Sequence, residues 1–119
     1  MDITRYDISE GAGRRPIMSR VVVHGDTVYL SGIASDPVGD IKTQTQQVLD
    51  RIDALLKKAG TDKSKLLTAQ IWLADMALYE DFNTVWNAWI DAKNPPARAC
   101  VRADLIRNCL VEIMVTAAK

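Results

Sequence analysis

Two segments near the carboxyl end of the chain alternate between apolar and other side chains with a period of two. In residues 97–103 every second residue is alanine or valine, and residues 110–117 repeat the pattern with valine, isoleucine and alanine. Because successive side chains of a β-strand point to opposite faces of the sheet, each segment predicts a strand with one buried face. If the two strands share a sheet, Arg98, Cys100 and Glu112 lie together on the face that this apolar set avoids. We therefore look for chemistry on that second face.

A β-hairpin is predicted upstream, in residues 20–32. Two β-branched runs flank the dipeptide Gly25-Asp26, and glycine at the first central position suits a type II′ turn. Residues 2–8 predict a short edge strand, and the glycines and proline of residues 11–16 predict a loop. Residues 32–39 predict a second loop that leaves the sheet.

An amphipathic helix is predicted between Ile41 and Ala59, where apolar side chains recur at the spacing of one buried stripe. Asp40 suits the N-cap position because its carboxylate can accept hydrogen bonds from free amides of the first turn. Gly60 suits a left-handed C-cap.

A strand and a second helix follow. The alternation in residues 66–74 predicts a strand that buries one face, formed by Leu67, Ala69, Ile71 and Leu73. Asp75 is predicted to begin the turn into a second helix, whose apolar side chains at helical spacing are Leu78, Phe82, Val85, Trp86, Trp89 and Ile90. Pro95-Pro96 ends it, since proline excludes the preceding residue from the helix.

The predicted order of elements is β-β-α-β-α-β-β, an α+β fold in one domain spanning residues 1–119. A strand–helix–strand crossover is right-handed, so both helices are expected to cover the same face of a mixed sheet. The opposite face is then expected to carry Tyr29, Ser31, Trp72, Arg98, Cys100, Arg102, Glu112 and Met114. Large apolar groups on an exposed face mark an interaction surface, so we expect another subunit to cover it.

Composition narrows the function classes. Fifteen basic and fifteen acidic residues cancel, so no net field favours nucleic acid or an anionic membrane. Two cysteines make no disulfide framework, and no apolar stretch approaches the length of a membrane span, so a cytoplasmic protein is expected. One histidine and no cysteine pair at ligand spacing predict no metal site, and no glycine motif indicates a phosphate-bearing cofactor.

Four motifs carry a resemblance to a known family. They are Val28-Tyr29-Leu30-Ser31-Gly32, Gln44-Thr45-Gln46-Gln47-Val48-Leu49, Pro96-Ala97-Arg98-Ala99-Cys100-Val101 and Val111-Glu112-Ile113. In this order and spacing the chain resembles the RidA/YjgF/YER057c/UK114 family of reactive-intermediate (enamine/imine) deaminases. Residues 83–89 further resemble a YoaB-like branch. The resemblance implies a chorismate-mutase-like fold assembled as a homotrimer, with a site in each cleft between neighbouring subunits.

The resemblance also implies roles for individual residues. The arginine of the Pro-Ala-Arg motif, Arg98, would bind a substrate carboxylate, and Glu112 would help to position the hydrolytic water. Ser31, Gly32 and Cys100 match further site positions. Met18 stands where archetypal members carry a tyrosine, and residues 104–109 replace a turn that contains lysine or proline in the family.

Each of these residues also has a purely structural interpretation. Arg98 could pair with Glu112 across the sheet, although a guanidinium binds a carboxylate through two parallel hydrogen bonds and so suits a ligand equally well. Cys100 could be a small buried hydrophobe, since no histidine stands at a spacing that would activate it. Trp86 and Trp89 are interpreted in the first place as residues of the core or of a subunit contact.

Three functions follow as hypotheses. The first is a deaminase that hydrolyses 2-enamine or 2-imino acids to 2-keto acids and ammonia, with a small-molecule carboxylate as substrate and no cofactor. The second is a non-catalytic protein that binds a 2-keto acid-like molecule in the same cleft. The third is an endoribonuclease, a role also attached to the family. It ranks last because a neutral chain with one histidine offers little to a phosphate.

Overall fold

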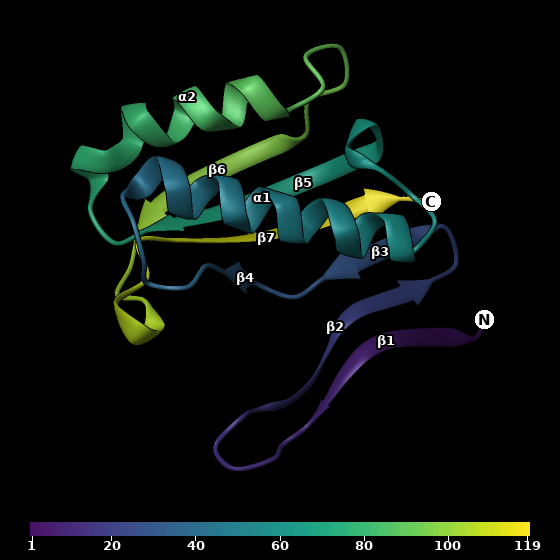
Figure 1. The fold of residues 1–119 in the computed structure, drawn as a ribbon. Helices are drawn as coiled ribbons and strands as arrows, with labels where there is room; N and C mark the ends of the chain where they lie inside the picture. Colours follow the sequence, from purple (N-terminus) through teal and green to yellow (C-terminus); the bar gives the residue numbers. More distant parts are fainter.

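The computed structural model describes residues 1–119 as a mixed seven-stranded sheet with two helices on one face (Figure 1). The strands are β1 Ile3–Glu10, β2 Ile17–His24, β3 Thr27–Leu30, β4 Ile33–Ala34, β5 Leu66–Leu73, β6 Ala97–Arg102 and β7 Val111–Ala118. The helices are α1 Ile41–Lys58 and α2 Tyr79–Trp89, with 3₁₀ turns η1 Lys63–Lys65, η2 Met76–Leu78 and η3 Ile106–Asn108. The spatial order is β1-β2-β3-β7-β5-β6, and β4 pairs with β7. No helix has the length and apolar character needed to cross a bilayer.

The predicted hairpin is confirmed as β2 and β3. His24 pairs with Thr27 across the turn, and Gly25 alone of the two turn residues has a positive φ, of 61°, as a type II′ turn requires. The predicted edge strand is also present, as β1 paired antiparallel to β2. The predicted loop after the hairpin contains one short strand, β4, which pairs with β7 and buries Ile33 in the core.

Helix α1 begins and ends as predicted. The Asp40 carboxylate accepts a hydrogen bond from the Thr43 amide at 2.9 Å, which also lowers the pKa of Asp40. At the other end Gly60 has a φ of 82°. Its amide donates to the Lys57 carbonyl, and the Thr61 amide donates to the Leu56 carbonyl, both at 3.0 Å. These two bonds form a Schellman motif, in which only glycine adopts the left-handed conformation without strain.

One residue of β5 departs from the predicted alternation. A β-bulge between Leu66 and Thr68 shifts the register against β7, so Leu66 is buried and Leu67 is 47% exposed. The prediction that Leu67 belongs to the buried face is therefore wrong. Ala69, Ile71 and Leu73 are buried as predicted, because alternation resumes after the extra residue of the bulge.

The position of β6 overturns the predicted grouping of Arg98 with Glu112. Strand β6 runs parallel to β5 at the sheet edge and pairs Arg98 with Ala69 and Cys100 with Ile71, so both side chains lie on the helix-covered face. Arg102 pairs with Leu73, so the base of its side chain also lies on the helix-covered face. Glu112 pairs with Trp72 and lies on the uncovered face.

The assignment failed because the alanines of β6 are too small to require burial, whereas α2 offers aromatic rings that contact the Arg98 guanidinium. The smaller apolar set of β6, formed by Ala97, Ala99 and Val101, therefore faces away from the helices.

The core and the uncovered face otherwise follow the prediction. Both helices pack on one face, and their apolar stripes meet the inner side chains of β2, β3, β5 and β7 in one cluster of 23 buried residues. Phe82, Trp86 and Trp89 of α2 are buried there, as expected of core residues. On the other face Tyr29 and Met114 are 44% and 42% exposed, and Val101 is 47% exposed.

Candidate functional site

A pocket of about 790 Å³ opens where β2 and β3 separate. Strand β3 ends at Leu30, paired with Val21, whereas β2 continues back to Ile17 with β1 as its only partner. The freed side of β2 faces β4, the middle of α1 and η3, and these elements form the walls. Four of the predicted site residues line this pocket together: Met18, Ser31, Gly32 and Glu112.

Gly32 brings the Glu112 carboxylate close to the backbone. A Cβ atom at position 32 would lie 2.4 Å from Glu112 Oε2, which is far inside van der Waals contact. The φ of Gly32 is not in the left-handed region, so glycine matters here for space: any larger residue would displace the end of the Glu112 side chain. Glu112 makes no ion pair, and its carboxylate therefore remains available to a ligand or water.

Ser31 presents an unsatisfied hydroxyl in the same pocket. Its amide donates to the Arg20 carbonyl at 2.9 Å, but its Oγ is buried and has no hydrogen-bond partner. A buried hydroxyl without a partner costs about 1–3 kcal/mol. A polar ligand or water in the pocket would remove that cost.

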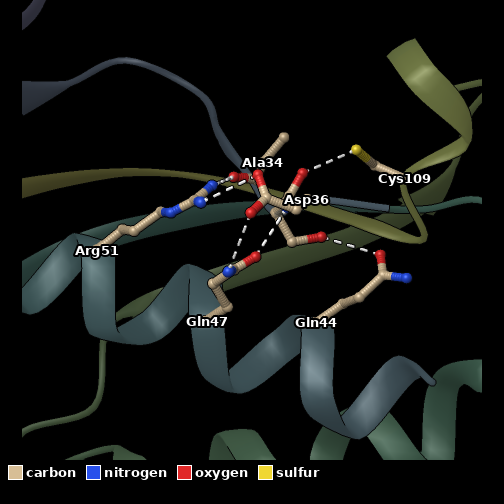
Figure 2. A network of polar contacts seen from close by, with 7 residues as sticks. Ala34, Asp36, Gln44, Gln47, Arg51 and Cys109 are labelled. Atoms are coloured by element: carbon tan, nitrogen blue, oxygen red, sulfur yellow. Dashed lines mark hydrogen bonds and ion pairs between the residues drawn. The ribbon is translucent and has the colours of Figure 1, made fainter. Parts of the chain in front are cut away.

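The wall beside β4 is fixed by polar side chains of α1 (Figure 2). Arg51 donates to the Ala34 carbonyl at 2.6 Å and to the Asp36 carboxylate at 3.2 Å. Gln47 accepts from the Asp36 amide at 2.7 Å. These contacts hold the segment after β4 against α1, and they give the 44–49 motif a structural role that sequence reasoning missed.

Gln44 and Cys109 complete this attachment. Gln44 Oε1 accepts from Ser35 Oγ and from the Leu110 amide, both at 2.9 Å, and its Nε2 donates to the Gly39 carbonyl. Cys109 is buried, and its thiol donates to the Ser35 carbonyl at 3.0 Å. The loop after β4 and the turn before β7 are thereby joined behind the pocket.

Arg98 lies elsewhere, against the aromatic stripe of α2. Its guanidinium carbon is 5.7, 5.7 and 5.3 Å from the ring centroids of Tyr79, Phe82 and Trp86, and its Nη2 donates to the Tyr79 hydroxyl at 3.0 Å. Such cation–π contacts contribute about 0.5–2 kcal/mol each, depending on desolvation. No carboxylate forms an ion pair with Arg98, so the interpretation as a partner of Glu112 is wrong and the guanidinium is free to bind an anion.

Of the rings around Arg98, the sequence predicts Trp86 as a core or subunit-contact residue and Phe82 as part of the apolar stripe of the second helix. The sequence does not single out Tyr79. Its hydroxyl lies at the first turn of α2, and only the register of β6 brings Arg98 into contact with it. The signal was present as the i, i+3, i+7 spacing of Tyr79, Phe82 and Trp86, which places three rings on one helix face.

Cys100 accompanies Arg98 on the helix-covered face. Burial raises the pKa of the Cys100 thiol, and the nearby Arg98 charge lowers it in part. A thiol with a raised pKa stays protonated at neutral pH and is a poor nucleophile. The structure therefore gives no support to covalent catalysis by Cys100.

The structure thus divides the predicted site into two parts. Met18, Ser31, Gly32 and Glu112 share the pocket, whereas neither Arg98 nor Cys100 lines it. Arg98 and Cys100 lie on β6, a strand that ends the sheet on the side opposite β1. Within one subunit the two parts do not form a single cavity.

The fold and these motifs define a member of the RidA/YjgF family, and the chain belongs to it. Residues 15–119 match the family described as "Endoribonuclease L-PSP". The chain falls in the YoaB-like branch. It is 40% identical over 101 residues to "RutC family protein YoaB" of Escherichia coli, which covers 84% of this chain and 89% of that protein. A RutC family protein of Haemophilus ducreyi is 40% identical over 118 residues, covering 98% and 96% of the two chains.

Solved structures agree with this assignment. A member of the YjgF protein family from Neisseria meningitidis superposes with a TM-score of 0.90 and is 40% identical, covering 100% of this chain and 96% of that chain. A Rid family protein of unknown function from Yersinia pestis superposes with a TM-score of 0.87 at 27% identity, covering 99% and 100%. The predicted fold is therefore confirmed.

Proposed function

We propose that this protein is an enamine/imine deaminase that hydrolyses 2-imino acids to 2-keto acids and ammonia. The single observation that carries the proposal is the free Glu112 carboxylate, which packs on Gly32 beside the unpaired Ser31 hydroxyl. Membership of the RidA/YjgF family supports the same reaction class. The free, aromatic-lined Arg98 supplies the complementary group for a substrate carboxylate.

The proposed reaction needs few groups. A 2-imino acid is already electrophilic at C2, so the protein has to hold the carboxylate and direct one water. Arg98 binds the carboxylate through its unused N–H groups. Glu112 accepts a proton as the water oxygen bonds to C2, and the C2–N double bond becomes a single bond. Glu112 returns that proton to the nitrogen, which gives a carbinolamine. A second proton passes from the new C2 hydroxyl to the nitrogen, so that the C2=O bond forms as the C2–N bond breaks, and ammonia and the 2-keto acid leave.

The proposal requires two subunits for each site, in a homotrimer. In one chain Arg98 lies outside the Glu112 pocket, and β6 has an open edge. A neighbouring subunit whose β6 edge approaches the pocket would bring its Arg98 to the Glu112 of the first. The exposed Tyr29, Val101 and Met114 on the uncovered face supply apolar area for such an assembly.

The direct test is a coupled assay in which an amino acid oxidase generates 2-iminopropionate and the protein accelerates its loss. Arg98→Ala is expected to lower kcat/KM by about tenfold or more, because a charge-assisted bidentate contact is removed. Arg102→Ala is the matched control, since Arg102 lies on the same strand and is exposed. The proposed mechanism fails if Arg98→Ala hydrolyses the imine as fast as the parent.

A non-catalytic binding protein is the second candidate, and one observation favours it. The carboxylate-binding Arg98 and the water-directing Glu112 lie apart in the chain's own fold, so binding can exist without turnover. Tight binding of 2-oxobutyrate with imine loss no faster than in buffer would select this candidate.

A further inference from the structure

The Glu112 pocket carries more positive charge than a single substrate carboxylate requires. Besides Glu112 and Asp36, its lining includes four arginines: Arg15, Arg20, Arg51 and Arg107. Under the proposed function, the carboxylate common to all 2-imino acids is already matched by Arg98 of a neighbouring subunit. The arginines of the pocket are therefore available to bind a second anionic group.

One of the four is committed to the fold. Arg51 pairs with Asp36 at 3.2 Å and donates to the Ala34 carbonyl at 2.6 Å. That arrangement uses the Asp36 charge as well. Arg15, Arg20 and Arg107 form no ion pair, so three guanidinium groups remain against the one carboxylate of Glu112.

Two of the three stand on anchored backbone. Arg20 belongs to β2, and its carbonyl accepts from the Ser31 amide at 2.9 Å. Arg107 belongs to η3 and has a left-handed φ of 53°. Two residues later, the buried Cys109 donates a hydrogen bond to the Ser35 carbonyl, which attaches the turn to the pocket wall. A cation on a fixed backbone binds an anion with less loss of entropy than one on a free loop.

We infer that the site prefers dicarboxylic 2-imino acids, such as the imine of an acidic amino acid, with Arg107 and Arg20 binding the second carboxylate. This inference rests on the proposed function and specifies its substrate class. A guanidinium presents parallel donors that match a carboxylate. The pocket volume of about 790 Å³ is ample for a dicarboxylic acid of this size. The chemistry is unchanged: water adds at C2, and a 2-keto dicarboxylic acid and ammonia leave.

The test compares two stable product-like acids on the full-length protein by titration calorimetry. 2-Oxoglutarate is expected to bind at least about tenfold more tightly than 2-oxobutyrate, and added salt should reduce that ratio. Arg107→Asn should lower the ratio by about tenfold, since asparagine tolerates the left-handed conformation while the charge is lost. Arg20→Gln, on a regular strand, repeats the test without any backbone question.

Arg14→Ala is the matched control, because Arg14 neighbours Arg15 in the same loop but does not line the pocket. It should leave the ratio unchanged. Equal affinity for the two acids, or the same ratio in Arg107→Asn and Arg20→Gln as in the parent, overturns the inference.

The two proposals fail separately. Rapid hydrolysis of 2-iminopropionate together with equal affinity for both acids would leave the deaminase proposal standing and remove the preference. Preferential binding of 2-oxoglutarate without hydrolysis of any imine would refute the deaminase proposal and leave the preference for dicarboxylic ligands standing.

Discussion

Arg98 is held from two directions, by aromatic rings and by one hydroxyl. The ring centroids of Tyr79, Phe82 and Trp86 lie 5.7, 5.7 and 5.3 Å from the guanidinium carbon, and the Tyr79 hydroxyl accepts a hydrogen bond from Nη2. An arginine side chain otherwise loses about 2 kcal/mol of rotamer entropy when it binds a ligand. Under the proposed function, this ordering would make Tyr79 a positioning residue for carboxylate binding.

Tyr79→Phe is therefore expected to raise KM for 2-iminopropionate about two- to tenfold, the equivalent of one lost hydrogen bond, while kcat changes little. Steady-state kinetics measures both. Tyr29→Phe is the control, since it removes a tyrosine hydroxyl on the opposite face of the sheet. A fall in kcat with KM unchanged would speak against a positioning role.

Gly32 and Glu112 predict a different kinetic signature. Gly32→Ala places a methyl group where the Glu112 carboxylate now lies, so the carboxylate has to move. We expect kcat to fall by about tenfold or more, because a displaced base no longer reaches the attacking water. In a Glu112→Gln background the same substitution should cost little further activity. Additive losses in the double variant would contradict this coupling.

At the scale of elements, α1 both packs the core and fixes a loop. Its apolar stripe faces the sheet, and Gln44, Gln47 and Arg51 on an adjoining stripe bind the segment after β4 (Figure 2). Gln44 alone satisfies the Leu110 amide, the Ser35 hydroxyl and the Gly39 carbonyl. Within the 44–49 motif, Gln44 and Gln47 thus attach the loop, while Val48 and Leu49 are buried in the core.

Gln44→Ala should lower the free energy of unfolding by about 2–3 kcal/mol, because it leaves buried polar groups without partners. Urea unfolding followed by circular dichroism measures the loss. Gln46→Ala, on the exposed side of the same helix, should change stability by less than about 0.5 kcal/mol. Equal effects of the two substitutions would remove the assigned role of Gln44.

Alternation and capping signals predicted nearly every element, because they depend on local backbone geometry. The hairpin at Gly25, the caps at Asp40 and Gly60, and α2 all agree with the structure. Alternation shows which side chains share a face, but it does not show which face the helices cover. For that reason Arg98 is predicted on the wrong face. Leu67 is predicted on the wrong face because a β-bulge depends on pairing with another strand and leaves no signal in the sequence of its own strand.

The candidate site was predictable only as a set of residues. The motifs named Met18, Ser31, Gly32 and Glu112, and the structure brings these four together. Their meeting depends on where β3 ends and β2 continues, which is set by pairing between distant segments. The contacts between Arg98 and the aromatic rings of α2 could not be predicted for the same reason, because they also depend on strand register.

At the scale of the whole molecule, the uncovered face of the sheet leaves several large apolar side chains exposed. The exposed side chains of Tyr29, Leu67, Val101 and Met114 gather on strands β3, β5, β6 and β7. We propose that this face is buried in a homotrimer. A charge there would be desolvated without a partner.

Val101→Glu is accordingly expected to dissociate the assembly while the subunit keeps its secondary structure. Light scattering measures the mass, and circular dichroism checks the fold. Val38→Glu is the control, because Val38 is 72% exposed and lies in the loop after β4. An assembly unaffected by Val101→Glu would place the subunit contact elsewhere.

The separation of Arg98 from the Glu112 pocket has a consequence for mixtures of damaged chains. If each site takes its arginine from one chain and its glutamate from the next, Arg98→Ala and Glu112→Gln subunits are each impaired alone but complement one another. Unfolded together and refolded at equal concentration, they should regain activity in about a quarter of the sites, since each site draws its two residues independently. Two variants of the same residue, mixed in the same way, should regain none.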